Sequence, residues 1–111
     1  MRTQILFDNV DASQDYTMDI TYPFEQDLRF LIQIEPTGTD ANPKLYIEES
    51  VNQTMWTAMR NPDNGANYFS VSELIGIKDN YFMGKYWRVR LEANGTTTGT
   101  IYGVVAYKTK P

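Results

Sequence analysis

The most informative stretch of this sequence is Leu28-Arg29-Phe30-Leu31-Ile32-Gln33-Ile34-Glu35. Every second position from Leu28 through Ile34 is apolar, whereas most of the intervening positions are polar. Side chains alternate between the two faces of an extended chain, so this period of two is typical of an antiparallel strand with one buried face. The stretch therefore predicts a strand that lies against a hydrophobic core.

The same alternation recurs along the chain and predicts further strands. In the best of these repeats Trp87, Val89 and Leu91 are expected to face inward. Arg88 lies between two of them and is expected to face outward, as strand geometry requires. The further strands are predicted at Thr3–Phe7, Tyr16–Tyr22, Lys44–Glu49, Tyr86–Glu92 and Thr98–Lys108.

Turn-forming residues separate these strands. The segment Pro36–Pro43 is a loop by composition and is expected to close a hairpin between its two flanking strands. Asn61–Gly65 predicts a second loop, and Asn94-Gly95 predicts a tight turn with positive φ angles. The segment Ser70–Glu73 fits a helix capping box and predicts one or two helical turns at most.

This order of short strands and turns predicts the fold class. The chain of 111 residues is expected to form a single domain over residues 1–111. We expect an all-β antiparallel sandwich with about eight strands and at most one short helical turn. A jelly-roll arrangement of the strands is one of the forms that such a sandwich can take.

The composition excludes several kinds of chemistry. The chain contains no cysteine and no histidine, which removes disulfides, thiolate nucleophiles and catalysis that depends on either residue. Asp11, Asp15 and Asp19 recur every fourth residue, but the surrounding pattern predicts loop and outward strand positions, not a paired acid site. The loop Asn61–Asn67 resembles a calcium loop that lacks its terminal acid. We therefore expect no enzyme activity, no cofactor and no metal.

The charge balance also limits the partners. Fourteen acidic residues against ten basic ones give a net charge of −4, which disfavours nucleic acid. No apolar run approaches the roughly 18–20 residues of a membrane-spanning helix. The first residues do not resemble a secretory signal. We expect synthesis in a cytoplasm, with no nucleic-acid partner and no membrane partner.

Aromatic residues suggest two kinds of binding surface. Tyr22, Tyr46, Tyr68, Tyr81 and Tyr102 are the candidates for exposed rings. Exposed rings could stack on sugars, as in carbohydrate-binding modules with a β-sandwich fold. Tyrosine is equally favoured where proteins bind one another, because it buries a large area at low entropic cost. Protein contact is the interpretation that we favour over sugar binding.

The last strand differs from the others because both of its faces are apolar. Ile101, Val105 and Tyr107 share one face, and Tyr102, Val104 and Ala106 share the other. One explanation is a central strand that is covered on both faces. The other is that Tyr102, Val104 and Ala106 dock onto another subunit. These three residues are our candidate protein interface.

The order of features from Leu28 to Lys108 resembles a group of small virion proteins of tailed bacteriophages. In that group a strand is followed by a turn and a tryptophan with threonine, here Ser50–Thr57 with Trp56. A strand of the form Tyr-x-Arg-Val follows, here Tyr86–Arg90, which contains Trp87 and Arg88. A turn and Thr98-Gly99-Thr100 then lead into the last strand. The Asp-Gly of the group's turn is replaced here by Gln53-Thr54.

The resemblance implies a structural role. Proteins of this group are β-sandwiches that decorate heads, form ring or neck layers, or support fibres. It implies a homo-oligomer that binds other virion proteins, is made in the cytoplasm of a bacterial host and is located in the virion, with no small-molecule ligand. Trp56 is expected to fill one end of the sandwich, and Gly99 to permit a tight turn into the last strand. The termini, Met1–Phe7 and Lys108–Pro111, are expected to be arms that pair with a neighbour.

Overall fold

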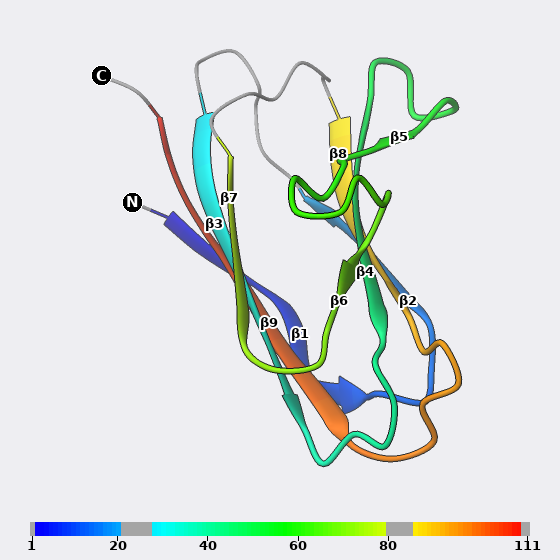
Figure 1. Cartoon of the computed structure of the whole chain (residues 1–111). Coiled ribbons are helices and arrows are strands. Elements are labelled where there is room, and N and C mark those ends of the chain that lie inside the picture. The colour runs from blue at the N-terminus through cyan, green and yellow to red at the C-terminus, as the bar shows by residue number, and fades with distance from the viewer. Residues whose placement is uncertain (1, 21–27, 80–85, 110–111) are drawn as a thin grey trace.

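The computed structural model describes residues 2–20, 28–79 and 86–109, which form strands and loops (Figure 1). No helix occurs within these three ranges, so none there could span a membrane. The strands are β1 (Arg2–Asp11), β2 (Tyr16–Ile20), β3 (Leu28–Thr37), β4 (Lys44–Ser50), β5 (Thr57–Ala58), β6 (Phe69–Ser70), β7 (Ile75–Asp79), β8 (Tyr86–Glu92) and β9 (Thr100–Thr109).

The strands form two antiparallel sheets that pack face to face. Sheet A has the order β1-β9-β3-β7, and sheet B has the order β2-β8-β4-β5, with β6 also paired to β4. Early strands pair with late strands in a nested series, β1 with β9, β2 with β8, β3 with β7 and β4 with β5 and β6. This nested pairing is the connectivity of a jelly roll. The predicted antiparallel sandwich is therefore confirmed, and the two short strands β5 and β6 occupy the place of one longer strand.

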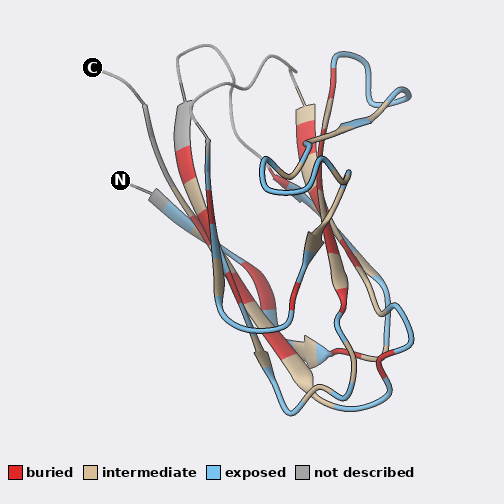
Figure 2. Cartoon of the chain, viewed as in Figure 1, coloured by how far each residue is buried: buried red, intermediate tan, exposed pale blue. Residues whose placement is uncertain are grey.

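The core lies between the two sheets (Figure 2). Phe30, Ile32 and Ile34 of β3 are all buried, which confirms the alternation in the opening stretch. Trp87 of β8 is only 1% exposed, and its ring centroid lies 5.2 Å from that of Phe30. The inward positions predicted for β4 and β8 are buried as well: Leu45, Ile47, Val89 and Leu91.

The expected hairpin between the third and fourth strands does not form. β3 belongs to sheet A and β4 to sheet B, so the loop at residues 38–43 carries the chain from one sheet to the other. Both strands have one apolar face, and they bury these faces against the core from opposite sides. The alternation identified the buried faces correctly, but the assumption that neighbouring strands pair was wrong.

The helical turn expected at Ser70–Glu73 is also absent. Ser70 belongs to β6, and the residues after it form bends that lead across to β7 in the other sheet. Val71 is fully buried, and its N–H donates to the Pro43 carbonyl at 2.9 Å. This bond and the burial of its side chain hold Val71 beside the loop that precedes β4.

The first strand extends over Arg2–Asp11, beyond the predicted Thr3–Phe7. Its register against β9 shifts between Ile5 and Phe7, so that Leu6 and Phe7 are both 2% exposed. A shift of this kind is a β-bulge, which lets two consecutive side chains face inward. The described residues of Met1–Phe7 are therefore not a free arm, because they pair with β9 within sheet A. Pairing of the other edge of β1 with a neighbour stays a prediction.

Candidate functional site

The proposed interface residues lie on the middle strand of sheet A. β9 pairs with β1 on one side and with β3 on the other, which confirms that it is a central strand. Ile101 and Val105 are fully buried on its inner face. Tyr102, Val104 and Ala106 alternate with them on the outer face and are half-buried. No described segment is seated over this outer face.

Neighbouring strands extend the apolar area around these residues. Ile5 of β1 lies opposite Val104 and is 52% exposed. Leu31 of β3 lies opposite Ala106 and is half-buried. We call the group of Ile5, Leu31, Tyr102, Val104 and Ala106 the sheet A patch. It crosses three adjacent strands, and apolar patches on the surface of a sheet often mark contacts with other proteins.

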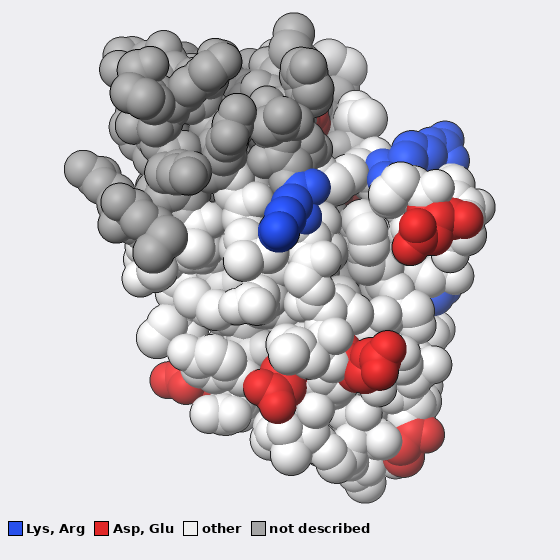
Figure 3. Space-filling view, turned by 60° about the vertical axis from the view of Figure 1, so that its left-hand side comes forward, with Lys and Arg blue, Asp and Glu red and all other residues white. Residues whose placement is uncertain are grey.

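Polar residues border the sheet A patch. Thr3, Gln33 and Glu35 pair with its members across β1 and β3. Figure 3, which turns the left-hand side of Figure 1 toward the viewer, shows mainly uncharged residues with scattered charges of both signs. An apolar centre with a polar margin is the composition of many protein interfaces.

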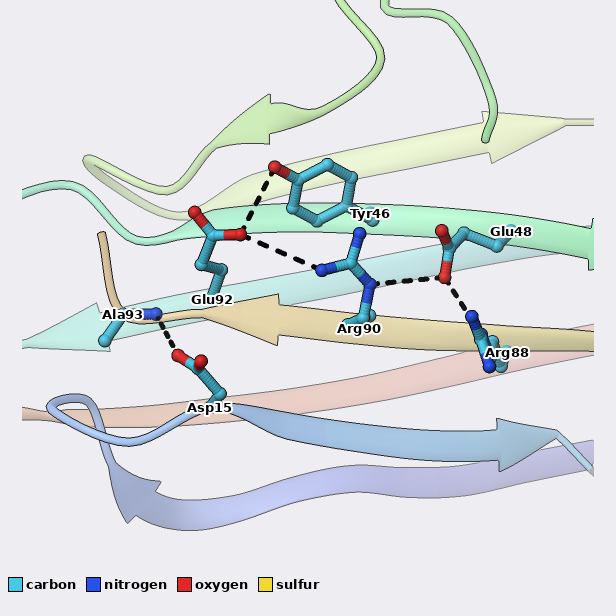
Figure 4. A network of polar contacts seen from close by, with 7 residues as sticks. All are labelled: Asp15, Tyr46, Glu48, Arg88, Arg90, Glu92 and Ala93. Atoms are coloured by element: carbon cyan, nitrogen blue, oxygen red, sulfur yellow. Dashed lines mark hydrogen bonds and ion pairs between the residues drawn. The ribbon is translucent and has the colours of Figure 1, made fainter. Parts of the chain in front are cut away.

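The outer face of sheet B has a different chemistry. Glu48 of β4 faces outward, yet it is only 8% exposed because two arginines of β8 cover it. Its Oε1 atom accepts hydrogen bonds from Arg88 Nε at 2.9 Å and from Arg90 Nε at 3.3 Å (Figure 4). Arg90 Nη1 also lies 3.8 Å from Glu92 Oε2. Arg88 therefore faces outward as expected, and acids beside the two arginines offset their charge.

Basic side chains on this face of sheet B lie over aromatic rings. The Arg90 guanidinium lies 4.0 Å from the centre of the Tyr46 ring, and Lys44 Nζ lies 4.5 Å from that of Tyr68. The two tyrosine rings are tilted by 49° with centroids 6.0 Å apart. A sugar needs an open and level aromatic face for stacking. Tyr46 and Tyr68 each have a cation over one face and do not share a plane, so together they offer no flat platform.

Trp56 belongs to this outer layer and not to the core. The Arg88 guanidinium lies 4.0 Å from the centre of its ring, and the residue is half-buried. The expectation that Trp56 fills an end of the sandwich is therefore wrong. It immediately precedes β5, and at this position the side chain packs on the charged face of β8.

Two of the five candidate tyrosines, Tyr22 and Tyr81, lie outside the described residues.

Gly99 lies where two loops meet at one end of the sandwich. Its φ angle is +101°, and a Cβ atom placed there would lie 2.7 Å from Gly38 C, Thr37 O and Thr39 N. The Thr98 hydroxyl donates to the Gly38 carbonyl at 3.0 Å, which holds the loops together. Glycine is thus required at this turn for two reasons, its backbone conformation and the close approach of the neighbouring loop.

Asp40 joins the same two loops. The Thr97 N–H donates to its Oδ1 at 2.8 Å and the Thr98 N–H donates to the same atom at 3.2 Å, while the Thr97 hydroxyl donates to Oδ2. The Thr97 hydrogen bonds, above all, lower the pKa of Asp40 from 3.8 to about 2. These donors favour the ionised carboxylate, so the contact is strongest when Asp40 is charged.

This contact predicts a pH dependence of stability. Because folding lowers the pKa of Asp40, its contribution is fully present above pH 3.8 and is lost as the pH falls toward about 2. Asp40→Asn should lower the urea midpoint at neutral pH. It should also reduce the decline of that midpoint as the pH falls from 3.8 to about 2. Thr97→Val removes the hydroxyl that donates to Asp40 and should produce part of the same effect. Urea unfolding at a series of pH values tests this, and an unchanged pH profile in Asp40→Asn would contradict it.

The acidic residues weighed as chemical sites have structural positions. Asp11 accepts from the N–H and hydroxyl of Ser13, which lower its pKa. Asp15 precedes β2 and accepts from the Ala93 N–H at 2.8 Å (Figure 4). Asp19 faces outward on β2, opposite Arg88. The predicted loop and outward strand positions of Asp15 and Asp19 are thus confirmed.

The loop that resembles a calcium site is organised by its own side chains. Asn61 Oδ1 accepts from the Asp63 N–H at 3.0 Å, and Asn64 Oδ1 accepts from the Ala66 N–H at 2.9 Å. These are Asx turns, in which the side-chain oxygen is used locally. Within the described part of the chain, no group of three or more potential ligands is arranged to hold a metal ion.

Comparisons with known proteins give no relative of this chain. No protein-family model, no curated protein and no solved structure matches the chain. The function must therefore be inferred from the surfaces described above.

Proposed function

We propose that this chain is a non-enzymatic structural protein that works through protein–protein contacts, as a component of a bacteriophage virion. The observation that carries the proposal is the sheet A patch, an apolar area across β1, β9 and β3 that no described residue covers. An assembly protein needs such a surface more than it needs a reactive group. The resemblance of Leu28–Lys108 to small phage virion proteins supplies the virion part of the proposal.

The connectivity is compatible with this role at the level of analogy. Jelly rolls occur in viral capsid proteins, and they also occur in lectins and enzymes. The fold therefore favours neither a virion role nor a sugar-binding role by itself. The arrangement of Tyr46 and Tyr68 gives less support to a carbohydrate-binding module, which remains the alternative. A glycan array on the purified chain tests that alternative through specific, saturable binding.

Mass spectrometry of purified particles tests the virion assignment directly. The phage that encodes this chain would be purified by density gradient, and the particle proteins would be digested and quantified against a known capsid protein. We expect peptides of this chain at a fixed ratio to the capsid protein in independent preparations. Absence of the chain from intact particles would overturn the assignment.

Val104→Asp tests whether the sheet A patch forms the contact. A carboxylate in its centre should weaken association at least about tenfold, because it would be buried without a partner. Because the Val104 side chain is only partly buried, the loss of folding stability should be about 1 kcal/mol, in the range of β-propensity effects. Light scattering after size exclusion measures association, and urea unfolding measures stability.

Thr17→Asp is the matched control for this experiment. Thr17 is exposed on β2, on the outer face of sheet B, and the substitution introduces the same charge. It should leave association unchanged. If both variants fold and assemble like the original, the sheet A patch is not the assembly surface.

A further inference from the structure

At two sides of the sandwich the edges of the two sheets face each other, and these sides differ in what covers the core between them. On one side β1 leads directly into β2, and the rings of Phe7 and Tyr16 lie with centroids 6.4 Å apart. The Ala12 N–H donates to the Gly99 carbonyl at 3.0 Å and fixes this crossing. On this side, therefore, an aromatic ring contact and a backbone hydrogen bond hold the strands over the core.

The opposite side, between β7 of sheet A and β6 of sheet B, is hollowed. A cavity of about 450 Å³ opens there. Met59, Phe69 and Ile75 line it, and these three side chains pack against the core but are only partly buried. Ile77 of β7 also lines it and is 7% exposed. The hollow thus gives access to the margin of the hydrophobic core.

One wall of the hollow is the edge of a sheet. β7 is the last strand of sheet A and pairs with β3 on one side only. Ile75, Gly76, Ile77 and Lys78 of β7 all line the hollow. No described residue donates a backbone hydrogen bond to the other edge of β7 or accepts one from it. A strand edge of this kind offers a row of N–H and C=O groups for pairing with another chain.

We propose that an extended segment of a partner protein pairs with β7 and becomes the fifth strand of sheet A. Its backbone would satisfy the open edge, and its inward side chains would contact Met59, Phe69 and Ile75. Only an extended chain can use both features, because the hydrogen-bonding groups recur along a strand and the apolar residues lie beside it. This inference concerns a second surface and goes beyond the sheet A patch.

The ends of this chain are not free to supply that segment in their described parts. Arg2–Asp11 and Thr100–Thr109 pair with each other inside sheet A. The charges at the hollow indicate the composition of the partner segment. Asp63 and Glu73 line it and are exposed, whereas Lys78 is the one basic residue among its described lining residues. We infer a segment in which apolar residues alternate with basic ones.

A capped synthetic peptide of four Val-Lys repeats provides the probe. Hydrogen exchange of the full-length chain, followed by mass spectrometry, would be measured with and without a saturating amount of the peptide. We expect amide exchange in Ile75–Asp79 to slow at least about tenfold. Of two peptides of equal composition with N-methyl groups on alternate residues, the one whose methyl groups lie on the edge that faces β7 should give no such protection. The one whose methyl groups lie on the opposite edge should protect as the unmethylated peptide does. Equal protection by the methylated peptides would overturn strand pairing.

Charge variants locate the contact. Glu73→Lys should weaken binding of the Val-Lys peptide roughly two- to fivefold, as expected for one exposed ion pair. Lys78→Glu should strengthen binding by a similar factor. The matched control is Asp19→Lys, which makes the same change of charge on β2, the edge strand of sheet B on the other side of the molecule, and should leave affinity unchanged.

Two results would contradict the proposed site. One is equal weakening by Glu73→Lys and by Asp19→Lys, which would indicate attraction by net charge alone. The other is protection that appears in β1 or β9 and not in β7. The experiment uses only the purified chain, so it stays informative even if the chain proves absent from phage particles.

Discussion

Trp87→Ala should remove about 3–5 kcal/mol from the free energy of unfolding, the loss typical of a large aromatic side chain deleted from a packed core. Trp87 is 1% exposed and packs against the ring of Phe30, which belongs to the other sheet. The substitution would leave a void between the sheets that rigid strands cannot close. Urea unfolding followed by far-ultraviolet circular dichroism measures the loss.

The second tryptophan is the natural control. Trp56 lies on the outer face of sheet B under the Arg88 guanidinium. Trp56→Ala should therefore cost about 1 kcal/mol or less, the range of an exposed cation–π contact. A loss in Trp56→Ala as large as that in Trp87→Ala would contradict the placement of Trp56 outside the core.

Gly99→Ala should lower stability by about 3 kcal/mol or more. An L-residue in a left-handed conformation costs about 1–2 kcal/mol by itself. At Gly99 the added Cβ would also lie 2.7 Å from three backbone atoms of residues 37–39, which cannot rotate away as a side chain can. The loops would have to separate, and the contact between Asp40 and Thr97 would be weakened. Thermal unfolding of the two proteins measures this difference.

Gly95→Ala separates the two causes of that loss. Gly95 has a φ of +82°, but no atom lies within 4 Å of the position that a Cβ would take. Its substitution should cost only about 1 kcal/mol, the price of the backbone conformation. If both variants lose the same stability, the close approach of the loops at Gly99 has no energetic importance.

The features of the fold that belong to a single strand were predictable from the sequence, and the pairing between strands was not. Alternation identified the buried faces of β3, β4 and β8, because burial of one face requires a period of two. Alternation contains no information about which strands pair, so the crossing between β3 and β4 was missed. The bulge near Leu6 was missed for a related reason, although the apolar run Ile5-Leu6-Phe7 departs from strict alternation and was a visible signal.

The candidate site was predictable only in its central strand. Two apolar faces on β9 indicated Tyr102, Val104 and Ala106. Ile5 and Leu31 join them through the register between strands, which a single sequence does not reveal. Glu48 was missed as a buried acid because its burial comes from arginines that lie forty and more residues away. The hollow beside β7 likewise arises from the distance between two sheet edges and has no local sequence signal.

The nested pairing of strands has a consequence for how the chain acquires its structure. Strand β1 is synthesised before its partner β9, and all the other strands lie between them in the sequence. Sheet A therefore cannot close on a ribosome until all the strands from β1 to β9 have emerged. Pairing between such distant segments requires closure of long loops, which places folding on the millisecond-to-second timescale of β-sandwiches. Until then the apolar strands remain exposed, so the period just after synthesis is when the chain is most prone to aggregate.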